Sequence, residues 1–194
     1  EDLIESVAGD ARIVDVSRGI DLLAFQDADH ATEEDHEAEG HQHEGVDPHT
    51  WFDPNNVMIW VDNIEAALSH LDPEHADAYA ANAEGYQTQL QDLDGWIRDL
   101  VVQVPEANRK LVTDHTAFTY LSAAYGFEQI GAVIPAYSTM AEPSAKELVQ
   151  LQEAIERHGV RAIFVGSTAN PRLADRIAED TGVQVVPLYV GSLT

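Results

Sequence analysis

A single long helix constrains the fold of this 194-residue chain more than any other segment. Between Pro73 and Pro105, apolar residues recur at alternating spacings of three and four, which is the period of one helical face. They are Ala76, Tyr79, Ala83, Tyr86, Leu90, Leu93, Ile97, Leu100 and Val104. At about 1.5 Å per residue, a helix over 73–104 is roughly 45–50 Å long. Because a small domain is shorter than this, we expect the helix to join two lobes. A coiled-coil dimer is the alternative, which Ala and Tyr at the seam positions disfavour.

Strands and helices alternate after the long helix. Apolar runs predict strands over 110–113, 129–134, 162–165 and 183–190, with helices over 116–125, 143–158 and 171–181 between them. Ser144 and Glu147 form a capping box at one helix start, Asn170 caps another, and a glycine follows each predicted helix. This alternation predicts a parallel α/β lobe.

The part before the long helix has fewer signals. Residues 11–16 form a short apolar run that predicts a buried strand, and Asp53 followed by Pro54 predicts the start of a further helix. The expected fold class is α/β, with two parallel-sheet lobes joined by one long rigid helix.

We expect three parts in this fold. The N-terminal α/β lobe comprises residues 1–72 and includes a His/acid loop over 27–46, the connecting helix comprises 73–104, and the C-terminal α/β lobe comprises 105–194. The chain starts inside a predicted helix and stops just after a predicted strand, so both lobes are expected to be truncated and the chain to be a fragment.

The charge of the chain excludes several partners. The formal net charge is -25, with 35 acidic and only 10 basic residues. Nucleic acids and anionic membrane surfaces require a basic surface, so neither is an expected partner. Dispersed acidity with little lysine is typical of a halophile's protein. There is no cysteine, so any metal must be held by His, Asp, Glu, carbonyl oxygens or water.

Histidines and acidic residues are concentrated between residues 30 and 49. The histidines of this tract are His30, His36, His41, His43 and His49. Imidazole binds zinc and similar ions, and carboxylates supply oxygen ligands to the same ions. The tract therefore predicts metal capture, although a solvated acidic loop has the same composition.

Ligands of open parallel α/β sheets bind beyond the carboxyl ends of the strands. Asp114 and His115 follow the first predicted strand of the second lobe, Gly166 follows the third, and Gly191 follows the fourth. His115 is the one imidazole among these positions. A lone histidine at a helix start is more often a cap, but a second imidazole across a cleft, that of His49, favours a metal site.

Three motifs resemble a known family. D-P-H-T-W at 47–51, R-K-L-V-T-D-H-T-A-F-T-Y-L at 109–121 and A-E-P-S at 141–144 are similar to the metal-binding solute-binding proteins of zinc and manganese ABC importers. The resemblance runs in order over essentially the whole chain, with a His/acid loop where zinc-type members have one. It implies an extracytoplasmic, lipid-anchored and monomeric protein that captures a divalent metal ion between its lobes for a membrane permease. His49 and His115 would be ligands, with an earlier histidine ligand upstream of Glu1.

The sequence departs from the family at two positions. The remaining ligands of the family follow the third and fourth strands, where this chain has Gly166 and Gly191. Glycine has no side chain to donate, so binding could be weaker, completed by water or the loop, or lost. A ligand-deficient relative could instead take a chelated or organic solute, or act in adhesion.

Further expectations follow for the ion and its surroundings. The histidine content favours Zn²⁺ over Mn²⁺, which prefers oxygen ligands, and His30, His36, His41 and His43 would gather or sense the ion. Asp47 and Asp114 are candidates to orient the two ligand rings, or else they are turn and cap residues.

Other residues carry no such chemistry. Trp51, Trp60, Trp96 and Tyr120 are expected to be core or cleft-wall aromatics. We do not expect an enzyme, because the H-E-x-x-H, G-x-S-x-G, Walker and G-x-G-x-x-G motifs are all missing from the sequence.

Overall fold

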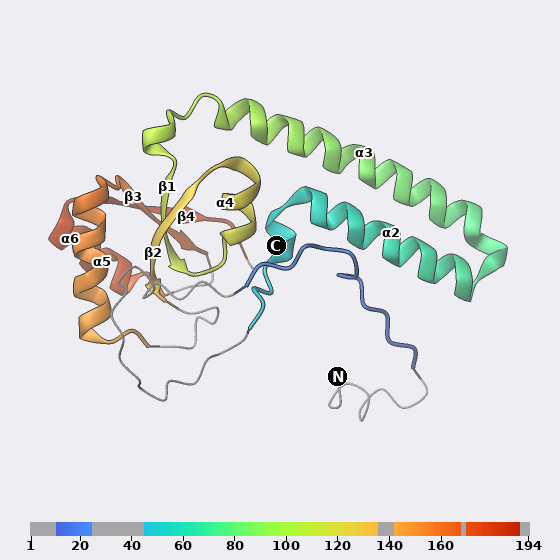
Figure 1. The fold of residues 1–194 in the computed structure, drawn as a ribbon, viewed down its shortest axis with the longest axis horizontal. Helices are drawn as coiled ribbons and strands as arrows, with labels where there is room; N and C mark the ends of the chain where they lie inside the picture. Colours follow the sequence, from blue (N-terminus) through green and yellow to red (C-terminus); the bar gives the residue numbers. More distant parts are fainter. Residues whose placement is uncertain (1–10, 25–44, 136–141, 168–169, 191–194) are drawn as a thin grey trace. The chain divides into compact units, whose positions relative to one another are not determined.

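Figure 1 shows the computed structural model, which describes residues 11–24, 45–135, 142–167 and 170–190. The chain divides into two compact units, each of which is described by itself below. The first unit comprises Glu1–Asp21 and Asp53–Leu100, and the second comprises Leu22–Phe52 and Val101–Thr194. Within the described ranges, no helix has both the length and the apolar character that a membrane span requires.

The second unit is built on a parallel four-stranded sheet in the order β2-β1-β3-β4. Its strands are β1 (Lys110–His115), β2 (Glu128–Ile134), β3 (Ala162–Gly166) and β4 (Gln184–Leu188). The central strand is β1, where Thr113 pairs with Ala132 of β2 and with Phe164 of β3. The α/β class and the four strands predicted after the long helix are confirmed. Because all strands run in one direction, their carboxyl ends share one edge, and His115 ends β1 at that edge.

Three helices connect successive strands of this sheet: α4 (Thr119–Tyr125), α5 (Ala145–His158) and α6 (Arg172–Thr181). Figure 1 shows α5 and α6 on one face of the sheet and α4 on the other. The capping box of α5 is present, since Ser144 Oγ accepts from the Glu147 N–H (3.3 Å) and the Glu147 carboxylate accepts from the Ser144 N–H (2.6 Å). Asn170 accepts a hydrogen bond from the Arg172 N–H, but α6 begins at Arg172 and its N-cap is Pro171, so the prediction that Asn170 caps this helix is wrong by one position.

The core of the second unit lies between the sheet and helices α5 and α6. Its buried side chains are Val112, Val133, Leu151, Ile155, Val160, Ile163, Val165, Ala174 and Ile177. Val112 in β1 and Ile163 in β3 have no exposed surface. Full burial of one such side chain contributes about 1.5–3 kcal/mol, so the strand that ends at His115 is firmly packed.

The first unit is a pair of antiparallel helices, α2 (Pro54–Leu71) and α3 (Ala76–Val101), joined through the short 3-10 helix η2 (Pro73–His75). Asp53 caps α2 by accepting from the Asn55 N–H at 2.9 Å, with Pro54 at the first helical position, as predicted. The Asn55 side chain of α2 also lies 3.4 Å from Asp94 of α3. A hydrogen bond from Gln87 to Asp62 joins the two helices further along.

Two predictions for the first unit are wrong. Residues 11–16 form no strand, because the described part of this unit offers no neighbouring strand to pair with. The Val16 carbonyl instead accepts from the Asn63 side chain (2.8 Å), and Ile13 is 54% exposed. The long helix is also shorter than 73–104. Residues Pro73–His75 wind as a 3-10 turn and α3 ends at Val101, which makes α3 about 39 Å long.

The two units also differ from the predicted division at residues 72 and 104. Helix α3 groups with α2, and the described residues 22–24 and 45–52, which precede both helices in the chain, group with the sheet of the second unit. The physical reason is visible around residue 52, where the ring of Phe52 lies 4.5 Å from that of Phe118. The described residues contain one sheet, so the second parallel sheet expected in residues 1–72 is not found among them.

Candidate metal centre

The structure brings His49 and His115 together, with ring centroids 5.4 Å apart and the ring planes inclined at 66°. Both belong to the second unit. His115 is the last residue of β1, at the carboxyl edge of the sheet, and His49 directly precedes the short 3-10 helix η1 (Thr50–Phe52). The His49 side chain is 9% exposed and that of His115 is 16% exposed. Two imidazoles thus share one largely buried location.

Asp47 orients the first imidazole. Its Oδ1 accepts a hydrogen bond from the His49 N–H (2.9 Å) and lies 2.8 Å from His49 Nδ1. The Asp47 side chain is fully buried. A carboxylate can only accept hydrogen bonds, so Nδ1 carries the proton and Nε2 keeps the lone pair with which imidazole binds metals.

Asp114 orients the second imidazole in the same way. Its Oδ1 accepts from the His115 N–H (2.9 Å) and lies 3.1 Å from His115 Nδ1. Its Oδ2 accepts from the Gly166 N–H of β3 at 3.2 Å. The carboxylate is therefore fixed by two neighbouring strands, and Nε2 of His115 is the nitrogen suited to a metal.

Both carboxylates are held in the ionised form. Burial is the largest single influence and acts to raise the pKa of Asp47, but hydrogen bonds from His49 and Thr119 and the electrostatic effect of His49 together outweigh it, so this pKa lies below its ordinary value of 3.8. Burial likewise acts to raise the pKa of Asp114, and hydrogen bonds from His115 and Gly166 together lower it. Ionised carboxylates at neutral pH keep both imidazoles in the metal-binding tautomer.

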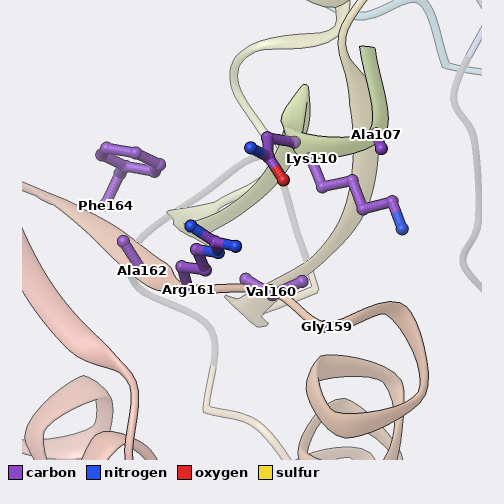
Figure 2. Close-up of a pocket in the computed structure, with 8 residues that line it drawn as sticks. Ala107, Lys110, Gly159, Val160, Arg161, Ala162 and Phe164 are labelled. Carbon is purple, nitrogen blue, oxygen red and sulfur yellow. The ribbon is translucent and has the colours of Figure 1, made fainter. Parts of the chain in front are cut away.

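A pocket of about 90 Å³ lies elsewhere on the second unit (Figure 2). It is lined by Lys110 at the start of β1, by Gly159, Val160 and Arg161, and by Phe164 of β3. Because β1 begins at Lys110 and ends at His115, this pocket is at the opposite edge of the sheet from the two histidines. It is not part of the imidazole site.

Comparison with known proteins identifies the family. The whole chain, residues 1–194, matches ZnuA, described as "Zinc-uptake complex component A periplasmic". The chain belongs to the ZnuA family. The predicted resemblance is therefore confirmed, and the family consists of substrate-binding proteins of transporters rather than enzymes.

Named relatives of this ZnuA-family chain bind different metals. The chain is 32% identical over 183 residues to "Manganese-binding lipoprotein MntA" of Halalkalibacterium halodurans, an alignment that covers 94% of the chain and 55% of the relative. It is 36% identical over 156 residues to "Zinc-binding protein AdcA" of Streptococcus pyogenes, with 79% and 29% covered. The chain thus spans about half or less of the length of these relatives.

Solved structures show the same fold. A Zn(II)-bound mutant variant of AdcAII from Streptococcus pneumoniae superposes with a TM-score of 0.75 at 28% identity, covering 92% of the ZnuA-family chain and 60% of AdcAII. A mutant of the laminin-binding adhesin Lmb from Streptococcus agalactiae superposes with a TM-score of 0.74 at 28% identity, covering 93% and 63%.

Gly166, a position where the ZnuA-family resemblance implied a ligand, has a structural role. A Cβ atom on Gly166 would lie 2.6 Å from Val190 Cγ2 and 3.2 Å from Asp114 Oδ2. The missing side chain therefore leaves no open space at this position, because Val190 already covers it. The missing side chain instead lets the Gly166 N–H reach Asp114. Gly191 lies outside the described residues.

Several predicted site residues cannot be placed. His30, His36, His41 and His43 lie outside the described residues. Within the described ranges, no group of three or more His, Cys, Asp or Glu side chains is arranged to hold a metal. The described part of the ZnuA-family site therefore consists of two imidazoles and their carboxylates, and the assignment of His49 and His115 as ligands stays a prediction.

Sequence reasoning missed polar functions of residues around the histidines. Tyr120, expected as a core or wall aromatic, is 4% exposed but uses its hydroxyl in two hydrogen bonds. Thr113 Oγ1 donates to the His115 carbonyl (2.8 Å) and accepts from the Gln129 side chain (2.8 Å). Only a general rule could have predicted the hydrogen bonds of Tyr120, namely that a buried tyrosine hydroxyl usually has a partner.

The tryptophans differ in their surroundings. Trp51 packs edge-on against His49 at 5.2 Å but is 46% exposed. Trp60 is partly buried and donates to Ser17 Oγ in the first unit (3.1 Å). Trp96 is 59% exposed on α3, so it does not belong to the core of its unit.

Proposed function

We propose that the chain is the metal-binding part of a solute-binding protein for an ABC importer, with Zn²⁺ as its main cargo and Mn²⁺ as the second candidate. The observation that carries the proposal is the pair of imidazoles 5.4 Å apart, each with Nδ1 on a buried carboxylate. Membership of the ZnuA family, and relatives named for zinc and for manganese, support it.

The choice of zinc rests on ligand chemistry. Neutral imidazole nitrogen suits zinc better than manganese, which prefers oxygen donors. A closed zinc site needs four ligands, so two more must join His49 and His115. Water, the His/acid tract or a histidine upstream of residue 1 would provide them. Protons compete for the same Nε2 lone pairs, so capture weakens at acidic pH.

The remaining parts of the proposal concern the cellular setting. We place the protein outside the cytoplasm, anchored by lipid and monomeric, with a membrane permease as the receiver of the ion. A relative named as a lipoprotein and the periplasmic family description support this setting. His30, His36, His41 and His43 would gather ions for the site, and the net charge of -25 suits a saline habitat.

Titration calorimetry with Zn²⁺ and Mn²⁺ on the complete protein in high salt tests the proposal. The wild type is expected to bind one zinc ion tightly and manganese more weakly, also after deletion of residues 30–45. The variants His49→Ala and His115→Ala should each lose more than the roughly 10–100-fold typical of changes in groups that orient a ligand. The variant His75→Ala, at a histidine whose side chain is 65% exposed, is the matched control and should bind like the wild type.

The same titration would indicate a second function, binding of a chelated solute or adhesion, if the protein does not bind metal at His49 and His115. The chain resembles a laminin-binding adhesin at 28% identity, and glycine occupies position 191, where the resemblance implied a ligand. If the wild type binds neither ion, or if the double variant at His49 and His115 still binds zinc stoichiometrically, the metal-binding assignment fails. A chelated solute or adhesion would then be the function to examine.

A further inference from the structure

The Tyr120 hydroxyl contacts two backbone segments, one on each side of residues 25–44. Tyr120 belongs to α4, the helix that follows His115, and is 4% exposed. Its hydroxyl accepts a hydrogen bond from the Leu23 N–H at 3.0 Å and donates one to the Asp47 carbonyl at 3.1 Å. One side chain therefore binds the backbone on both sides of residues 25–44.

The two backbone segments are also bonded to each other. The Asp47 N–H donates to the Leu23 carbonyl at 3.0 Å, and Ala24 and Val46 form an antiparallel bridge. Leu23, Asp47 and Tyr120 thus form a closed set of three hydrogen bonds, which we call the Tyr120 clamp. It joins the residues on both sides of the segment 25–44 to the helix next to His115.

The clamp acts on the same residue that orients His49. The backbone N–H and carbonyl of Asp47 are both bonded within the clamp, while its side-chain Oδ1 holds the His49 N–H and Nδ1. Both peptide groups of Asp47 are fixed, so the direction of its buried carboxylate is fixed as well. Without the hydroxyl, the part-buried Leu23 N–H and the buried Asp47 carbonyl would each lose a partner, and the local backbone would move to recover one.

We propose that Tyr120 is a positioning residue for metal binding: through Asp47, its hydroxyl sets the tautomer and the orientation of His49. The inference rests on the proposed function, because it assigns His49 as a ligand. It predicts that the hydroxyl, and not the ring, matters. The ring of phenylalanine would keep the packing of α4 but could neither accept from Leu23 nor donate to Asp47.

The first test reads the tautomer of His49 directly, without any metal. Long-range nitrogen–proton NMR spectra of the metal-free complete protein should show the proton on Nδ1 of His49 in the wild type. The variant Tyr120→Phe should show a mixture of tautomers. The variant Ser122→Ala is the matched control, because the Ser122 hydroxyl is buried in the same helix and makes no hydrogen bond within the described residues. It should give the wild-type spectrum.

The second test measures zinc affinity in a double-mutant cycle. Tyr120→Phe should weaken zinc binding about tenfold, within the range for groups that orient a metal ligand, and Ser122→Ala should stay within about twofold of the wild type. If Tyr120 acts through Asp47, adding Tyr120→Phe to the Asp47→Asn variant should lower its zinc affinity by less than about twofold, because Asp47→Asn has already removed the carboxylate through which Tyr120 acts. Independent, multiplicative losses would overturn the proposal.

Hydrogen exchange of the wild type tests the clamp without a variant. The amides of Leu23 and Asp47 should be protected to a degree similar to β1, and exchange at the rate of an open loop would overturn the proposal even if Tyr120→Phe failed to fold. An unchanged His49 tautomer in a folded Tyr120→Phe variant would overturn it too. Absence of zinc binding by the wild type would instead refute the proposed function, since the tautomer and exchange measurements need no metal.

Discussion

Replacement of Asp47 by asparagine tests the central geometry of the candidate metal centre. Asp47 Oδ1 receives two donors, the His49 N–H at 2.9 Å and His49 Nδ1 at 2.8 Å, and the side chain is fully buried. Asparagine has nearly the same shape but no charge, and its oxygen must stay toward the His49 N–H, which only an acceptor can satisfy. A neutral amide oxygen holds the Nδ1 proton less firmly than a carboxylate does, so more of the imidazole would place its proton on Nε2, the atom that is needed for the metal.

The expected loss of zinc affinity in Asp47→Asn follows from this geometry. Loss of a group that orients a metal-bound histidine typically reduces affinity 10–100-fold, which corresponds to about 1.4–2.8 kcal/mol of binding free energy. Zinc titration of the complete protein near pH 7.5, with a competing chelator to set the range, measures the change. Because the Asp47 side chain is fully buried, we expect a value toward the upper end of this range.

Asp72 provides a matched control on the first unit. Its Oδ2 lies 2.8 Å from His75 Nδ1, the same distance as in the buried pair, but the Asp72 and His75 side chains are 42% and 65% exposed. Asp72→Asn should therefore leave zinc affinity within about twofold of the wild type. Zinc affinity of Asp47→Asn that matched that of Asp72→Asn would show that the buried carboxylate does not orient a ligand, and the reasoning would be refuted.

Two further predictions concern stability. The pKa values of Asp47 and Asp114 are lowered in the folded protein, so the stability they contribute is present above the ordinary value of 3.8 and is lost as pH falls through the folded values. Urea unfolding of the metal-free protein between pH 6 and 2.5 should show this loss of unfolding free energy. In the double variant Asp47→Asn/Asp114→Asn, the unfolding free energy should fall less steeply as the pH is lowered. An unchanged pH dependence would contradict the lowered pKa values of these two carboxylates. Gly166→Ala should destabilise the protein by about 1–3 kcal/mol, because the new Cβ would lie 2.6 Å from Val190 Cγ2. Gly85→Ala, in α3 with nothing within 4 Å, should be neutral or stabilising by up to about 1 kcal/mol, and equal effects of the two substitutions in urea melts would rule out the packing argument.

Local signals in the sequence predicted much of the second unit. The capping box at Ser144 and Glu147 lies where expected, and Gly126 takes the left-handed conformation (φ 72°) that ends α4. Such features depend on residues within a few positions of each other, so they can be read without knowing the fold. By contrast, the predicted helix start at residue 116 was wrong. Pairing with β2 extends β1 to His115, and α4 begins only at Thr119.

The candidate site was only partly predictable. The family motifs indicated His49 and His115, and their neighbours Asp47 and Asp114 were visible in the same motifs. Nothing in the sequence indicated that the Tyr120 hydroxyl would bind both Leu23 and Asp47, because these contacts join residues far apart in the chain. The structural role of Gly166 could not be predicted for the same reason, since the atom that covers this glycine belongs to Val190 after another strand.

The sequence by itself determined the order of strands and helices, where most of them begin and end, the family, and the residue types available for a metal. These properties follow from short-range hydrogen bonding, periodicity and side-chain chemistry. Only the tertiary structure decided which carboxylate holds which imidazole, that residues 22–24 and 45–52 group with the sheet, and that residues 11–16 form no strand. A strand needs a partner and a buried carboxylate needs donors, and both are supplied by segments that only folding brings near.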